Sequence, residues 1–204
     1  DQLSALQCNV ESKSGIGGSR MKRILLFFYQ YSSLKVAVLF TAIFIGYLVL
    51  VMTHKATGFE LSDGNIKSLG MSFGFDKEDI TVFFNTRTDD MINAYINFNQ
   101  VWDVLFGVIY GLMHTIWVSV LFKPFFGKAG SVNLIPLVQV LFDWLENYTL
   151  GFLAQQYLVD GTISSSIADL ASAFCMIKWA FSGLTYALIL VGVILLIYRF
   201  FKVK

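Results

Sequence analysis

Residues 133–158 read NLIPLVQVLFDWLENYTLGFLAQQYL, and this stretch decides the fold. It is long and apolar enough to cross a bilayer, which takes about 20 residues of helix. Asp143 and Glu146 nevertheless stand at its centre, where contact with lipid costs a carboxylate several kcal/mol. Both must therefore face other helices. Because residues three and four positions apart share a helix face, Asn147 and Gln139 extend the same polar patch.

The composition of the whole chain assigns the protein class. The sequence has 204 residues, of which 56% are hydrophobic and 14% charged, whereas about a quarter of the residues in a soluble domain are charged. We therefore expect an all-α integral membrane protein. The net charge of +1 gives no support to nucleic-acid binding, which requires a basic face. Cys8 and Cys175 show neither a disulfide framework nor metal-binding spacing, and we expect no cofactor.

Four apolar stretches predict a four-transmembrane-helix bundle. Residues 54–100 are the largest polar piece, and we expect them to form a small extracytoplasmic cap between the first and second spans. Within this cap, Asp76 and Thr88 are the predicted starts of helices. The polar residues 1–20 are interpreted as a tail or an expression remnant, and 21–204 as a single membrane domain. The expected spans are about 35–53, 101–123, 133–157 and 172–200.

The distribution of basic residues predicts the orientation of the bundle. Positive charge accumulates on the cytoplasmic side of membrane proteins. With four spans, one membrane side collects seven basic residues, and the connection near Asp160 on the other side has none. Both termini are therefore expected to be cytoplasmic. The residues concerned are Lys22, Arg23, Lys123, Lys128, Arg199, Lys202 and Lys204.

Polar residues of the neighbouring spans supply candidate partners for the central carboxylates. Asp103, Tyr110 and His114 fall on one stripe of the second span, and Gly107 with Gly111 forms a GxxxG pair that permits close helix approach. Estimated depths predict an ion pair between Glu146 and Lys178 and a hydrogen bond between Asp143 and His114. The candidate ligand-binding or ion-binding residues are Asp143, Glu146, Asn147, His114, Lys178, Asp103 and Tyr110.

The third and fourth spans also resemble a known group of proteins. The third has the pattern Asp-x-x-Glu-Asn at Asp143, Glu146 and Asn147, and the fourth has Lys178 followed by Trp179. This combination resembles uncharacterised bacterial four-helix inner-membrane proteins over about residues 21–204. The resemblance implies a bacterial inner-membrane location and the four-helix architecture. It implies no activity.

Three functions of different classes are compatible with these residues. The first is binding or transport of a proton, cation or small polar ligand at the carboxylate patch, since intramembrane charges mark functional sites. The second is a structural or assembly subunit, in which the polar residues join helices. The third is a membrane metalloenzyme with Asp143, Glu146 and His114 as metal ligands. Beyond the lipid bilayer, the expected partners are further copies of the chain or other subunits of a membrane complex.

Overall fold

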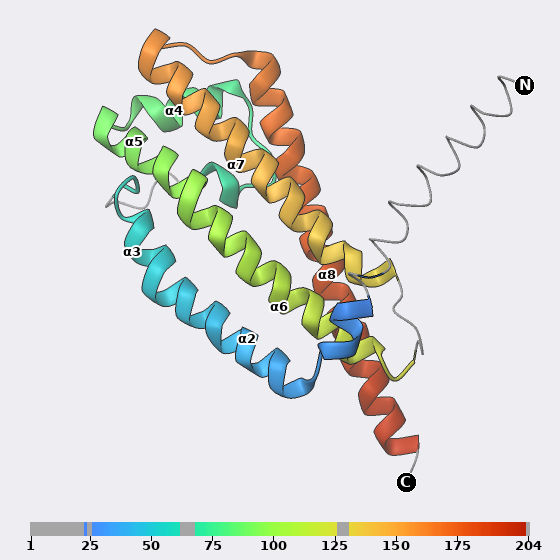
Figure 1. The fold of residues 1–204 in the computed structure, drawn as a ribbon. Helices are drawn as coiled ribbons and strands as arrows, with labels where there is room; N and C mark the ends of the chain where they lie inside the picture. Colours follow the sequence, from blue (N-terminus) through green and yellow to red (C-terminus); the bar gives the residue numbers. More distant parts are fainter. Residues whose placement is uncertain (1–22, 24–25, 62–67, 126–130, 203–204) are drawn as a thin grey trace, which may run out of the picture.

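The protein is described by a computed structural model that covers residues 23, 26–61, 68–125 and 131–202. The predicted tail of residues 1–20 lies outside the described residues, as do Lys22, Lys128 and Lys204. The covered chain forms helices and turns, with no strand among the elements described. The long helices run side by side, and each is antiparallel to the one before it in the chain (Figure 1). They are α2 (Leu34–Tyr47), α6 (Val104–Phe122), α7 (Ile135–Asp160) and α8 (Ser165–Lys202).

In the part of the chain that the structure describes, three continuous helical stretches are long and apolar enough to cross a membrane: Leu34–Ala56, Asp89–Phe122 and Ser165–Lys202. The first joins α2 to α3 (Thr53–Ala56), and the second joins α5 (Asp89–Asn97) to α6. The all-helical, membrane-compatible architecture expected from the composition is therefore confirmed. α7, which carries the central carboxylates, is not among these three stretches, because its polar residues lower its mean hydropathy.

Helix α7 lies between α6 and α8 and packs along both, whereas α2 packs chiefly against α6. Glycine makes the α6–α7 approach close. A Cβ atom on Gly111 would lie 2.4 Å from Cγ2 of Val140, and one on Gly107 would lie 2.7 Å from Nε1 of Trp144. The GxxxG pair thus sits at a helix contact, as the sequence predicted.

The part of the chain between the first two long helices folds over one end of the bundle. Helix α4 (Lys77–Asn85) begins after Asp76, whose side chain and that of Asp79 form a reciprocal capping box, and Thr88 caps α5. Both predicted helix starts are confirmed. Phe59, Phe83 and Tyr95 are buried against the ends of α7 and α8. This part therefore shares its core with the long helices, because it has too little apolar surface for a core of its own.

Two predicted spans are parts of longer helices. The second span continues without a break from the helix predicted to start at Thr88, so one helical stretch runs on from Asp89, and the fourth long helix starts at Ser165 rather than near 172. In each case the polar residues before the apolar run continue the same helix, since polar side chains at an exposed helix end need no lipid contact. Both helices therefore extend beyond their apolar runs, and their polar first turns lie at the end of the bundle that is covered by the chain between α2 and α6, here called the cap.

Two π-helical turns interrupt the described helical stretches: η1 (Leu48–Met52) lies between α2 and α3, and η3 (Phe98–Asp103) lies between α5 and α6. Such turns are uncommon and are found often at functional sites. The hydroxyl of Tyr47, beside η1, donates a hydrogen bond to the carbonyl oxygen of Trp102 in η3, with 2.9 Å between the two oxygens. The two irregular turns therefore lie next to each other on neighbouring helices.

Candidate functional site

Lys178 of α8 lies at the centre of the polar site. Its ammonium forms an ion pair with Oε2 of Glu146 and lies 3.5 Å from Oδ1 of Asp143. Glu146 is completely buried, and Lys178 and Asp143 are nearly so. The ion pair predicted between the third and fourth spans is thus confirmed, with Asp143 as a second carboxylate beside the same cation.

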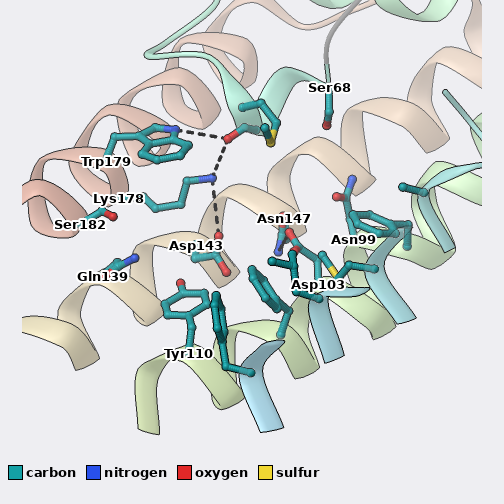
Figure 2. Close-up of a pocket in the computed structure, with 18 of the residues that line it drawn as sticks. Ser68, Asn99, Asp103, Tyr110, Gln139, Asp143, Asn147, Lys178, Trp179 and Ser182 are labelled. Carbon is teal, nitrogen blue, oxygen red and sulfur yellow. Dashed lines mark hydrogen bonds and ion pairs between the residues drawn. The ribbon is translucent and has the colours of Figure 1, made fainter. Parts of the chain in front are cut away.

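A turn from the cap completes the surroundings of Lys178. The short helix η2 (Leu69–Met71) brings the carbonyl oxygen of Gly70 to 3.1 Å from Nζ of Lys178 and 3.2 Å from Nε1 of Trp179. Figure 2 shows both bonds converging on this oxygen. The turn therefore reaches the polar centre, instead of lying in the water-exposed layer that was expected for residues 54–100.

Asp103 joins the site from the end of η3. Its Oδ2 accepts a hydrogen bond from Nδ2 of Asn147 at 2.9 Å. Asp103 remains partly accessible, and its carboxylate faces the same space as Asp143 (Figure 2). Two carboxylates, those of Asp143 and Glu146, thus lie beside Lys178, and that of Asp103 borders the same cavity.

The two aspartates border a cavity of about 500 Å³ between α2, α6, α7, α8 and the Gly70 turn. Lys178 is the only lysine or arginine among the described residues that line it, and Glu60 is a further acid near its rim. Of the two π-helical turns, Leu48, Met52, Phe98, Asn99 and Asp103 line the cavity. Its other lining residues include Phe44, Phe106, Tyr110, His114, Gln139, Asn147, Trp179, Ser182 and Tyr186.

Several buried polar atoms at this cavity make no hydrogen bond of regular geometry. They include Oδ2 of Asp143, Oε1 of Gln139, the hydroxyl of Tyr110 and both ring nitrogens of His114. The Tyr110 hydroxyl lies beside the Asp143 carboxylate, and the His114 ring lies beside Gln139. Each of these side chains is more than nine-tenths buried. Unpartnered buried polar groups are uncommon and call for an explanation such as a bound ligand or water.

The hydrogen bond predicted between Asp143 and His114 is wrong. His114 instead lies beside Gln139 and packs against the rings of Tyr110 and Tyr186. The prediction counted depth from assumed membrane surfaces, but the glycine contacts of α6 set the helix register. In that register Asp143 lies opposite Gly107, two helical turns from His114.

The predicted metal ligands do not come together. Among the described residues, no group of three or more His, Cys, Asp or Glu side chains is placed to hold a metal ion. The carboxylates of Asp143 and Glu146 share Lys178, while His114 lies further along the cavity. An ammonium group therefore already occupies the position between the two carboxylates.

The structure also adds site residues that were not predicted: the Gly70 turn, Asn99, Trp179 and the α2 wall around Phe44. One signal could have indicated the turn. Residues 69–75 read LGMSFGF, which is unusually apolar for a water-exposed loop. The contribution of η3 had no such signal, because a π-helical turn leaves no clear pattern in a helical sequence.

Comparisons of the chain with protein families, with curated proteins and with solved structures find no match.

Proposed function

We propose that the protein is an integral membrane protein that binds a small cation at the carboxylates of Asp103 and Asp143. The observation that carries the proposal is the excess of acid at the cavity. Two buried carboxylates, Asp143 and Glu146, lie beside a single lysine, and a third, Asp103, borders the same cavity. Lys178 balances one of them, since a buried ion pair holds one positive and one negative charge. The remaining negative charge calls for protons or a bound cation, because an uncompensated charge is costly to bury.

The proposal includes a fourth crossing, by α7. The first residues of α7 lie at the end of the bundle where α6 finishes, and its last residues lie at the opposite end, where α8 begins. It packs against both helices. Its 26 residues correspond to about 39 Å at 1.5 Å per residue, which is enough to cross. Lys123, Arg199 and Lys202 would then share the cytoplasmic side with both termini, and the cap would be extracytoplasmic. A bacterial inner-membrane location stays a prediction from the resemblance.

The cavity favours a binding role over one in which the polar residues only hold helices together. In a purely structural network, polar groups satisfy one another. Here the Glu146–Lys178 pair and the Asn147–Asp103 hydrogen bond do so, but one oxygen of the Asp143 carboxylate makes no hydrogen bond of regular geometry and borders the cavity. A cation placed there would supply the missing positive charge.

The test is cation-dependent thermal stability of the protein in lipid nanodiscs. Ammonium, methylammonium, sodium and potassium are compared at constant ionic strength and neutral pH. A ligand that binds only the folded state raises the unfolding temperature. We expect at least one of these cations to do so for the natural protein and for Asp160→Asn, an exposed change on the same helix. Asp143→Asn should abolish the effect. If none of the cations changes the unfolding temperature of the natural protein, cation binding is refuted.

A role as an assembly subunit is the second candidate. Met71 and Phe73 next to the Gly70 turn are 70% and 72% exposed, so the cap offers apolar side chains that a partner could cover. Co-purification of a stoichiometric partner from native membranes, lost in Phe73→Ser, would support this function. The metalloenzyme reading has no arrangement of ligands to support it among the described residues.

A further inference from the structure

The cavity next to Asp143 has two unlike walls. Asp103, Asp143 and Gln139 make the polar wall, and Phe44, Leu48, Met52, Phe98 and Phe106 make the apolar wall. A volume of about 500 Å³ falls in the range of small-molecule sites, which is about 300–1,000 Å³. A bare inorganic ion would contact the polar wall alone and leave the apolar wall uncovered.

The atoms without partners identify the kind of positive group that fits. Oδ2 of Asp143 and Oε1 of Gln139 are acceptors that make no hydrogen bond of regular geometry, and the nearby donors are the hydroxyl of Tyr110 and the ring of His114. A protonated primary or secondary amine brings N–H donors together with its charge, and charge-assisted hydrogen bonds are the stronger ones. A quaternary ammonium carries the charge but has no N–H group, so it would leave both oxygens without hydrogen bonds.

We infer that the ligand is a hydrophobic amine in its protonated form. Its N–H groups donate to the carboxylates of Asp143 and Asp103, and its apolar part lies on Phe44 and Phe106. These two rings stack at 5.5 Å between centroids and so form a continuous apolar surface. The inference rests on the proposed cation binding and adds the chemical class of the ligand.

The rim of the cavity has the same dual character as the inferred ligand. The exposed side chains there include Leu48 and Tyr186 on the apolar side and Thr53 and Glu60 on the polar side. Tyr186 is 56% exposed. An amine with an apolar substituent can therefore meet matching groups along its path from the membrane surface to Asp143.

The experiment is calorimetric titration of the protein in nanodiscs at neutral pH, with empty nanodiscs as the blank. Four probes separate the contributions: butylammonium, ammonium, butyltrimethylammonium and butanol. Each methylene group that becomes buried contributes about three- to fourfold in affinity. Butylammonium should therefore bind at least tenfold tighter than ammonium. It should also bind at least tenfold tighter than butyltrimethylammonium, which lacks N–H donors, and butanol should not bind.

A variant of the apolar wall separates the inference from the proposed function. Phe106→Ala should lower the ratio of butylammonium affinity to ammonium affinity at least fivefold, while Phe152→Ala, on the exposed face of α7, should change neither affinity. If ammonium or a metal cation binds as well as butylammonium, cation binding stands and the amine class is refuted. Equal or tighter binding of butyltrimethylammonium refutes N–H donation to Asp143. Absence of binding by all the charged probes refutes both proposals.

Discussion

Gly70 and Lys178 stand 108 positions apart in the sequence, and the ammonium of Lys178 donates a 3.1 Å hydrogen bond to the carbonyl oxygen of Gly70. This bond joins the cap to the polar centre of the long helices. Because Lys178 also pairs with Glu146, the position of the cap turn depends on a charge in α8. Cap and bundle are therefore expected to unfold together.

Gly70→Ala tests how tightly the turn is seated. A Cβ at this position would lie 3.2 Å from Oε1 of Glu146 and 3.5 Å from Nζ of Lys178, so it would displace the turn or the ion pair. We expect a loss of about 1 kcal/mol in stability, comparable to the net worth of one hydrogen bond. Thermal unfolding in detergent measures it. Gly183→Ala is the control, since its Cβ would meet no atom within 4 Å. Equal midpoints for the two variants would show that the turn is not constrained.

The ion pair between Lys178 and Glu146 should behave as one unit. Lys178→Met leaves a buried carboxylate without its cation, and breaking a buried pair costs about 3–5 kcal/mol. Adding Glu146→Gln removes that stranded charge and should recover roughly 2 kcal/mol. The measurement is the coupling energy in a double-mutant cycle of unfolding. Losses that simply add would mean that the pair is not energetically coupled.

The approach of α6 to α7 predicts a clash that a second mutation should relieve. A Cβ on Gly111 would lie 2.4 Å from Cγ2 of Val140, and overpacking of this kind costs about 1–3 kcal/mol. Gly111→Ala should therefore lower the unfolding temperature, and Val140→Ala should restore much of the loss in the double variant. Gly46→Ala on α2, where nothing lies within 4 Å, should have little effect. Lack of rescue by Val140→Ala would place the damage elsewhere.

The proposed topology predicts opposite labelling of the two ends of the bundle. In a background with Cys8 and Cys175 replaced by serine, single cysteines are placed at the exposed positions Glu78 and Lys202. A membrane-impermeant maleimide should label Glu78→Cys in intact cells and Lys202→Cys only after the membrane is opened. Labelling of Lys202→Cys in intact cells would overturn the orientation.

The sequence was informative where burial of charge dictates the structure. The cost of two carboxylates in an apolar helix pointed to a cation on a neighbouring helix, and Glu146 does pair with Lys178. Helix starts were also predictable, because the backbone N–H groups in the first turn of a helix need an acceptor. Asp76 and Thr88 each offer a side-chain oxygen to such a group.

The register of α6 against α7 and the insertion of the Gly70 turn at Lys178 could not be predicted in this way. His114 was assigned to Asp143 from estimated depth alone. In the structure, the close contacts of Gly107 and Gly111 set the register of α6 against α7, and in this register His114 lies beside Gln139. The contact of Gly70 with Lys178 joins segments far apart in the sequence, and no local pattern encodes it. Whether the candidate residues bind a ligand stays a prediction that only the binding measurements can test.

The π-helical turn at Phe98–Asp103 has a consequence for how this protein tolerates changes in length. A π-helical turn closes its hydrogen bonds over one more residue than an α-helical turn, so it holds one extra residue in nearly the same rotation about the axis. Deleting a single residue there should therefore leave an ordinary α-helix, with α5 and α6 in nearly their present orientation. The same deletion in the regular part of α6 would rotate everything beyond it by about 100°. The turn is thus the place in this helix where a change of length is absorbed, and what it alters is the placing of its own residues Asn99 and Asp103 at the cavity.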